Sequence, residues 1–170
     1  MKENEENAGK ETKTFNPRES IQRAEAYKQA EEGHCLKVSD TEFVWATKME
    51  RVSLIRHRLP FESIEVVSKK VDLPVKQVLN LIGLPQTTYN KKKRENDLLS
   101  GRDSELILVL TELLDFGLGV FNGERDKFLR WLKKPNVSLG GFIPESLFDS
   151  LTGIQEVKSC LNRLEYGNLA

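Results

Sequence analysis

The sequence lacks the residues on which several classes of protein depend. Its 170 residues include two cysteines, Cys35 and Cys160, too few and too isolated for a disulfide framework. The two histidines, His34 and His57, form no Cys/His spacing typical of a metal site. No run approaches the ~18 apolar residues of a membrane-spanning helix, and the acidic residues 1–6 are unlike a secretory signal. We therefore expect a cytoplasmic protein that binds no metal and enters no membrane.

Residues that could carry out catalysis are also scarce. Neither histidine has a serine or cysteine in a recognisable nucleophile context. Gly140 and Gly141 have neither the lysine nor the preceding strand of a phosphate-binding loop. Acidic pairs such as Glu31 and Glu32 fall on expected surface helices, where they usually only solvate the helix. We expect no catalytic residue, no cofactor and no enzyme activity.

Charge is balanced over the whole chain but unevenly distributed along it. The formal net charge is zero, with 31% charged and 38% hydrophobic residues, a composition that favours a solvated or disordered portion. Residues 48–96 carry eleven basic and five acidic residues, a net charge of +6, whereas residues 97–170 carry eight and eleven, a net charge of −3. A nucleic-acid surface would therefore lie in the middle of the chain.

The first 46 residues are expected to form a flexible extension with one helix. Residues 1–14 carry almost no apolar side chains and are expected to be disordered. The pattern at residues 16–19, an N-cap asparagine, a first-position proline and a capping-box glutamate, predicts a helix to about Glu32 that Gly33 ends. Residues 36–45 fit either a short strand or an extended packing segment, because Asp40 interrupts their β-branched and aromatic run.

Residues 47–97 have the organisation of a helix-turn-helix region. Thr47 and Glu50 form a capping-box pattern, and prolines and glycine separate the apolar stripes that follow. The expected helices are Lys48 to about Arg58, Glu62–Val71, Pro74–Ile82 and Pro85 to about Glu95. The last two are short and joined by a turn that contains Gly83, and the second is basic. This arrangement indicates a helix-turn-helix, with the second helix reading DNA.

Eight residues of that second helix are the candidate DNA contacts. Those expected to face base edges are Gln86, Thr87, Thr88 and Asn90. Those expected near phosphates are Lys91, Lys92, Lys93 and Arg94. The lysine run also fits a solvated helix whose charges only keep the chain in solution, and the short-helix, glycine, short-helix order favours the DNA interpretation.

Residues 98–170 predict a separate helical domain. The segment from Arg102 to Phe121 is apolar nearly all round, so it should be a buried hub helix, and its glycines suggest close helix packing. A second amphipathic helix ends before Pro135 and carries Trp131, which we expect to be a buried core anchor and not a binding residue. A double-glycine turn follows, then a helix start at Pro144 and a final helix from about Gly153 to Tyr166.

The order of residues in this part resembles a known family. The matching residues are Arg130-Trp131-Leu132, Pro135-Asn136, Leu139-Gly140-Gly141, Pro144 and Glu165-Tyr166-Gly167. Together they resemble the C-terminal toxin-binding domain of Xre/MbcA/ParS-type antitoxins, the partners of RES-domain toxins. The resemblance covers roughly residues 98–170 and extends more weakly to about Thr47, where Leu59-Pro60 also matches. Arg58 replaces a glycine of the family, and the recognition helix has lysines in place of arginines, so operator sequence cannot be transferred.

The resemblance implies a fold, a function and partners. It implies an all-α protein with an N-terminal helix-turn-helix (Xre-like) region, residues 47–97, followed by a small helical toxin-binding domain, residues 98–170. The chain would be a type II antitoxin that covers the active site of a RES toxin, which attacks NAD or uses it for ADP-ribosylation, and that represses its own operon. Its partners would be the toxin and operator DNA, as a homodimer or a larger complex with toxin.

The segment implied to enter the toxin is the last of the sequence. It consists of Glu165, Tyr166, Gly167, Asn168, Leu169 and Ala170. An idle terminus is the other interpretation of this segment. Two alternatives to the whole function remain at this point: a stand-alone transcription regulator whose C-terminal domain dimerises, and an enzyme-associated adaptor that has lost DNA binding.

Overall fold

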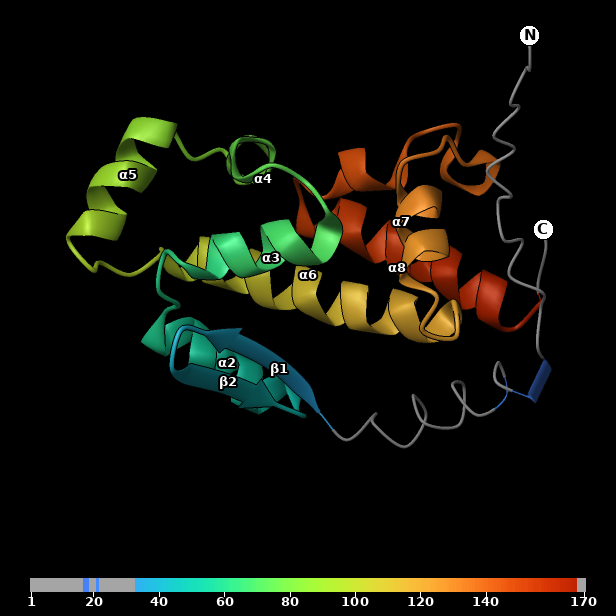
Figure 1. Ribbon diagram of the computed structural model, residues 1–170, viewed down its shortest axis with the longest axis horizontal. Coiled ribbons are helices and arrows are strands. Elements are labelled where there is room, and N and C mark those ends of the chain that lie inside the picture. The colour runs from blue at the N-terminus through green and yellow to red at the C-terminus, as the bar shows by residue number, and fades with distance from the viewer. Residues whose placement is uncertain (1–16, 19–20, 22–32, 168–170) are drawn as a thin grey trace, which may run out of the picture.

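The computed structural model describes residues 17–18, 21 and 33–167, and its elements are mainly helical (Figure 1). In chain order they are β1 (His34–Val38), β2 (Thr41–Trp45), α2 (Lys48–His57), α3 (Ser63–Val71), α4 (Val75–Ile82), α5 (Gln86–Arg94), α6 (Gly101–Val120), α7 (Arg125–Leu132), η1 (Val137–Leu139), η2 (Pro144–Leu147) and α8 (Leu151–Glu165). The helical fold class predicted from the sequence is confirmed, and a two-stranded hairpin is added to it. The helix predicted over residues 16–32 lies largely outside the described residues.

Local sequence signals set the ends of the helices as predicted. At the start of α2 the Thr47 hydroxyl accepts the Glu50 N–H, while the Glu50 carboxylate accepts the Thr47 N–H at 2.9 Å, so the capping box is complete. Gly83 ends α4 with a φ of 72°, in the left-handed region that glycine adopts most readily. Each helix from α2 to α5 begins and ends within one residue of its predicted bounds.

Helix α6 is the central element of the fold. It runs for 20 residues along the long axis of the molecule, with α3 and the hairpin beside it and α7 and α8 towards one end (Figure 1). Its buried residues cover most of its circumference: Ser104, Leu106, Ile107, Leu108, Leu110, Thr111, Leu113, Leu114 and Gly117. The remaining side, with Glu105, Val109 and Glu112, is half-buried and lines a cavity, so the prediction of burial on every side is only partly right. In the described part of the chain no single helix is long and apolar enough to cross a membrane. Helices α6 and α7 have that length and apolar character only when taken together, and a 120° bend separates them.

The hairpin β1–β2 is part of the folded body. The two strands pair antiparallel, with His34 opposite Trp45 and Val38 opposite Thr41. Leu36, Val38 and Trp45 face the helices and are buried, while the alternate side chains face outward. The strand alternative for residues 36–45 is therefore the correct one, and the folded body begins before residue 47.

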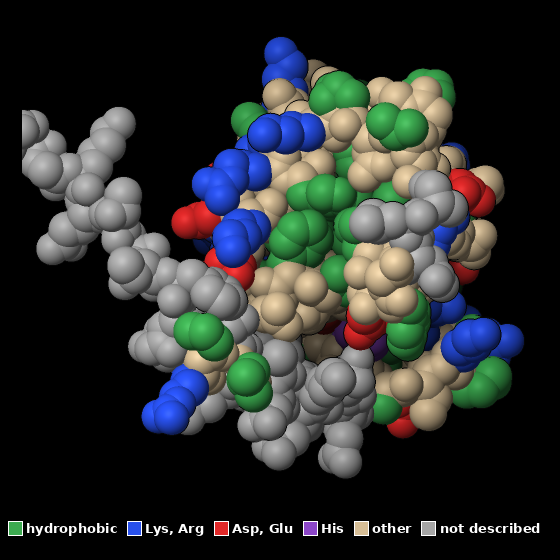
Figure 2. Space-filling model, turned by 90° about the vertical axis from the view of Figure 1, so that its right-hand side faces the viewer, with side chains coloured by type: hydrophobic (Ala, Val, Ile, Leu, Met, Phe, Trp, Pro, Cys, Tyr) green, Lys and Arg blue, Asp and Glu red, His purple; other side chains and the backbone are tan. Residues whose placement is uncertain are grey.

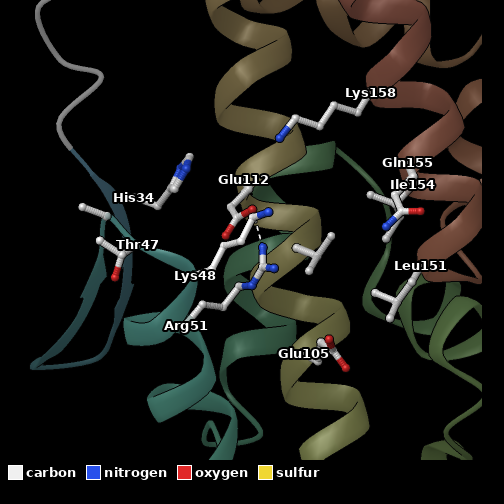
Figure 3. Close-up of a pocket in the computed structure, with 12 residues that line it drawn as sticks. His34, Thr47, Lys48, Arg51, Glu105, Glu112, Leu151, Ile154, Gln155 and Lys158 are labelled. Carbon is white, nitrogen blue, oxygen red and sulfur yellow. Dashed lines mark hydrogen bonds and ion pairs between the residues drawn. The ribbon is translucent and has the colours of Figure 1, made fainter.

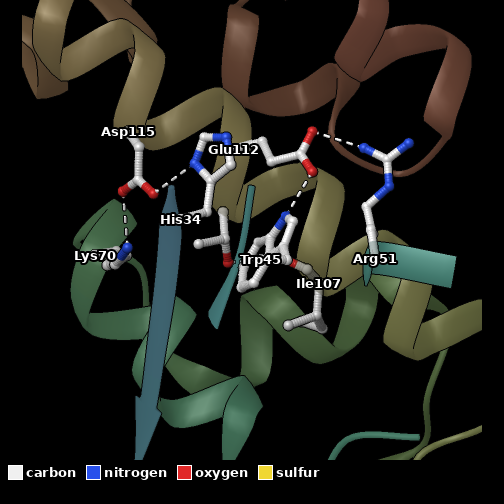
Figure 4. A network of polar contacts seen from close by, with 8 residues as sticks. His34, Trp45, Arg51, Lys70, Ile107, Glu112 and Asp115 are labelled. Atoms are coloured by element: carbon white, nitrogen blue, oxygen red, sulfur yellow. Dashed lines mark hydrogen bonds and ion pairs between the residues drawn. The ribbon is translucent and has the colours of Figure 1, made fainter. Parts of the chain in front are cut away.

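Two carboxylates of α6 fasten this hairpin (Figure 4). Glu112 accepts the Trp45 indole N–H at 2.7 Å and an Arg51 guanidinium N–H at 2.6 Å. Asp115 lies 3.2 Å from His34 Nδ1 and accepts the Lys70 ammonium at 2.8 Å. Burial alone would raise the pKa of Asp115, but these hydrogen bonds from His34 and Lys70 hold it below its ordinary value.

The two glycines of α6 differ in what surrounds them. A Cβ at Gly117 would lie 2.4 Å from ring carbons of Phe128 and 3.2 Å from Leu161, whereas a Cβ at Gly119 would meet nothing within 4 Å. Close helix packing therefore accounts for Gly117 and not for Gly119.

We predict that Gly117→Ala lowers the free energy of unfolding by about 1 to 3 kcal/mol, because overpacking forces Phe128 from its place. The matched variant Gly119→Ala should raise it by up to about 1 kcal/mol, since alanine is the better helix former. Urea denaturation monitored by circular dichroism measures both. If Gly117→Ala raised the free energy of unfolding as much as Gly119→Ala does, the close packing of Phe128 on Gly117 would be contradicted.

Candidate functional site

Helices α4 and α5 form the helix-turn-helix unit. The Gly83 N–H bonds to the Asn80 carbonyl at 3.2 Å and the Leu84 N–H to the Leu79 carbonyl at 2.9 Å, which closes the end of α4. The chain then passes through Pro85 into α5, which stands at one end of the molecule away from the bundle (Figure 1). Two short helices joined by a tight glycine turn, the second exposed, have the geometry that places a helix in a DNA groove.

Tyr89 fixes the orientation of α5. It is the buried residue of that helix, with its ring centroid 6.2 Å from that of Phe61. Its hydroxyl donates to the Glu65 carboxylate of α3 at 2.8 Å, and Lys93 bonds the same oxygen. Burial, together with the Glu65 carboxylate, raises the pKa of the Tyr89 phenol far above its ordinary value. The phenol therefore stays protonated and continues to donate at any physiological pH.

The eight predicted DNA contacts lie together on α5, in different settings. The exposed ones are Gln86, Thr87, Asn90, Lys91 and Arg94, and the half-buried ones are Thr88, Lys92 and Lys93. Among the four cations, Lys92 pairs with Asp97 at 2.5 Å and Lys93 pairs with Glu65. Lys91 and Arg94 have no carboxylate partner among the described residues.

Helical geometry separates these residues further. At 100° per residue, Thr87, Lys91 and Arg94 share the face opposite the buried Tyr89. That face points away from the body of the protein, whereas Lys93 lies nearer to the side that packs on α3. The outward face of α5 is thus polar and carries two cations without a carboxylate partner among the described residues, Lys91 and Arg94. The sequence alone did not distinguish these two from Lys92 and Lys93.

The second candidate site is the opposite end of the molecule, where α6 and α8 end and α7 begins (Figure 1). Figure 2 shows this face, with hydrophobic side chains gathered in its middle and Lys and Arg side chains along one border. Glu165, Tyr166 and Gly167 are exposed here, with Tyr166 at 74% of its surface. Asn168, Leu169 and Ala170 of the predicted contact segment lie outside the described residues.

Trp131 does not occupy the position expected for it. It is only partly buried and packs at the edge of the core against Phe121 and Phe128, at ring-centroid distances of 6.0 and 6.4 Å. Phe128 and Leu132, four residues apart, form the buried stripe of α7 instead. Trp131 is thus a half-buried residue packed on the core and not the fully buried anchor that was predicted.

Sequence reasoning did not identify the loop beside this face as a binding candidate. Between α7 and η2, residues 136–142 project Val137, at 93% exposure, and Phe142, at 60%. The Arg163 guanidinium of α8 donates to the Ser138 carbonyl at 3.3 Å, which places the loop next to the end of α8. The sequence shows that this turn contains Val137 and Phe142, but only the structure shows that they face outward.

A cavity of about 310 Å³ separates the hairpin and α2 from α8 (Figure 3). Its charged lining residues are Lys48, Arg51, Glu105, Glu112 and Lys158. Arg51 is bound to Glu112 across it, so part of this lining holds the fold together. The described residues contain no group of three or more His, Cys, Asp or Glu side chains that could hold a metal ion.

Two family models match consecutive parts of the chain. Residues 50–110 match the antitoxin Xre-like helix-turn-helix domain, and residues 119–167 match the antitoxin Xre/MbcA/ParS C-terminal toxin-binding domain. The first match spans α2 to the middle of α6, and the second contains the end face and its loop. The gap between the two matches falls inside α6, and the domain boundary at residue 97 stays a prediction.

Curated proteins of the same kind are similar over most of their length. "Antitoxin Xre" of Photorhabdus laumondii is 24% identical over 115 residues, which are 68% of this chain and 78% of that protein. "Antitoxin Xre" of Yersinia enterocolitica is 25% identical over 116 residues, with the same two coverages. The "Prs ADP-ribosylating antitoxin" of a Sphingobium species is 27% identical over 133 residues, 74% of this chain and 84% of that protein. Together, the two family matches and these relatives support an antitoxin of the Xre/MbcA/ParS type.

Proposed function

We propose that this chain neutralises a RES-type toxin, which consumes NAD or uses it for ADP-ribosylation, and that it represses its own operon through α5. The observation that carries the proposal is the match of residues 119–167 to a toxin-binding domain, directly after a helix-turn-helix domain. An antitoxin acts by binding, so its own residues need no catalytic role. The name of the Sphingobium relative, "Prs ADP-ribosylating antitoxin", supports this class of toxin.

The mechanism we propose for neutralisation is occlusion. Residues 165–170 would enter the cleft of the toxin and block access of the dinucleotide substrate. The exposure of Glu165 and Tyr166 and the φ of 66° at Gly167, which turns the chain out of the helix, support this proposal. Such a segment leaves α8 intact when it binds, because the buried residues of α8 end at Leu161.

Co-expression with the cognate toxin tests the assignment against its main alternative. We expect the two chains to copurify as a complex that survives size-exclusion chromatography. A stand-alone regulator whose C-terminal domain only dimerises would elute without toxin, at the size of its own dimer. Recovery of this chain alone, beside a folded toxin, would contradict the proposed function.

For operator binding we predict that the outward cations of α5 matter most. Each phosphate that is neutralised contributes about 0.9 to the slope of log affinity against log salt concentration. The variant Lys91→Ala with Arg94→Ala should therefore flatten this slope by about 1.8 and weaken binding. Fluorescence anisotropy with operator DNA over a series of salt concentrations measures both quantities.

The matched control is Lys92→Ala with Lys93→Ala, which removes the same amount of charge from the same helix. These lysines already neutralise Asp97 and Glu65, so their removal should change the salt slope less. A larger loss from the control pair would mean that α5 meets DNA through its other side. Unchanged affinity in both variants would exclude α5 as the recognition helix.

A further inference from the structure

The loop between α7 and η2, residues 136–142, is built as a closed unit. The Asn136 N–H donates to the Phe142 carbonyl at 3.0 Å, and the Gly141 N–H donates to the Asn136 carbonyl at 2.9 Å. The Asn136 side chain also accepts the Ser138 N–H at 2.9 Å. Asn136 thus ties both ends of the loop together.

The double glycine is what allows this shape. Gly140 and Gly141 have φ values of 67° and 84°, in the region that side chains with a Cβ rarely adopt. Leu139 points inward and is buried, and Arg163 holds the Ser138 carbonyl from the side of α8. The loop is therefore anchored from within by one leucine and from α8 by one arginine.

The outward side of the loop carries two apolar residues with no role in the fold. Val137 is 93% exposed and Phe142 is 60% exposed, while their backbone carbonyls accept the N–H groups of Gly140 and Asn136. Because the backbone that carries them is already ordered by hydrogen bonds, a partner that covers these side chains pays less entropy to order the loop. This combination is typical of residues that anchor a protein interface.

The position of the loop indicates which partner covers it. It lies inside residues 119–167, the part that matches a toxin-binding domain. Through Arg163 it adjoins the last turn of α8, where Leu164 and Tyr166 are also exposed. Figure 2 shows further hydrophobic side chains across this same end of the molecule. The loop is thus continuous with the segment proposed above to enter the toxin.

We propose that Val137 and Phe142 form an apolar projection that inserts into a hydrophobic pocket on the toxin, beside the cleft that residues 165–170 enter. The proposal rests on the proposed function and adds a second contact to it. The projection supplies affinity and holds the complex together, while the segment after α8 blocks the active site. The two parts are separable, because one is a braced loop and the other follows a helix end.

The test measures toxin affinity by biolayer interferometry with an inactive toxin variant. Val137→Ser with Phe142→Ser should raise the dissociation constant about tenfold to a hundredfold, mainly through faster dissociation. The matched control is Val44→Ser with Met49→Ser, at 61% and 72% exposure near the hairpin and α2, and should leave the affinity unchanged. Phe142→Leu alone should retain most of the affinity, because it keeps an apolar group in the pocket.

The outcomes are distinguishable from those that concern the proposed function. If the native chain binds the toxin and the serine variant binds equally well, the projection is overturned while the antitoxin role stands. If the native chain binds no toxin, both fail. If the serine variant binds toxin normally but changes from dimer to monomer in sedimentation, the loop serves a second copy of this chain and the proposal is overturned. Melting of each variant by circular dichroism shows that the fold is retained, as the exposure of both side chains predicts.

Discussion

Trp45→Ala should lower the free energy of unfolding by about 3 to 5 kcal/mol, the usual cost of removing a large buried aromatic. Trp45 is 1% exposed and joins the hairpin to the hub helix. The substitution leaves a cavity, and it also takes away the indole N–H that Glu112 accepts. Urea denaturation followed by far-ultraviolet circular dichroism measures the change. A loss below about 1 kcal/mol would mean that the hairpin is a detachable extension.

A second variant separates packing from hydrogen bonding at this position. Trp45→Phe keeps most of the apolar volume but removes the donor, while the Arg51 guanidinium still satisfies Glu112. Trp45→Phe should therefore lower the free energy of unfolding less than Trp45→Ala does, because phenylalanine leaves a smaller cavity. Both variants should leave operator binding by the folded fraction unchanged, since α5 lies at a distance from the hairpin (Figure 1).

Deletion of residues 167–170 should restore NAD consumption by the toxin within the purified complex. Helix α8 ends at Glu165, and its buried residues Ile154, Val157, Cys160 and Leu161 are untouched by the deletion. The melting temperature should therefore stay nearly constant, and the toxin should still bind through the helices and the loop. Inhibition alone should be lost, because the segment that blocks the cleft is missing.

The experiment is run at equal, near-stoichiometric concentrations of truncated and intact chain. Tyr166→Ala in the intact chain is a useful companion, because it removes the exposed ring and keeps the length. We expect partial release of toxin activity from this variant. Full inhibition by the truncated chain would show that the helices alone occlude the toxin, and that residues 165–170 have no inhibitory part.

Much of the helical architecture could be predicted because its signals are local. Thr47 and Glu50 lie three residues apart and predicted a capping box that the structure contains. Gly83 predicted the turn of the helix-turn-helix in the same way. The apolar run of residues 106–121 predicted a buried hub helix, because no face of it could remain in water.

The features that were not predicted depend on contacts between distant residues. Trp45 is buried in the core, and its indole N–H is accepted by Glu112, 67 residues away in the sequence. Lys93 differs from Lys91 only because Glu65 of α3 lies beside it. Trp131 fits the same apolar pattern as Phe128, yet it is only half-buried, against Phe121 and Phe128. Periodicity identifies an apolar stripe, but the packing partner decides which residue is at its centre.

The most direct test of the central claim is the NAD-consuming activity of the cognate toxin, titrated with this protein. The account predicts that activity falls linearly to near zero at a fixed molar ratio, with both chains in one complex. The endpoint should not depend on operator DNA, because the toxin-binding end and α5 lie at opposite ends of the molecule (Figure 1). Undiminished activity at a large excess of folded protein would contradict the assignment of this chain as the antitoxin of that toxin.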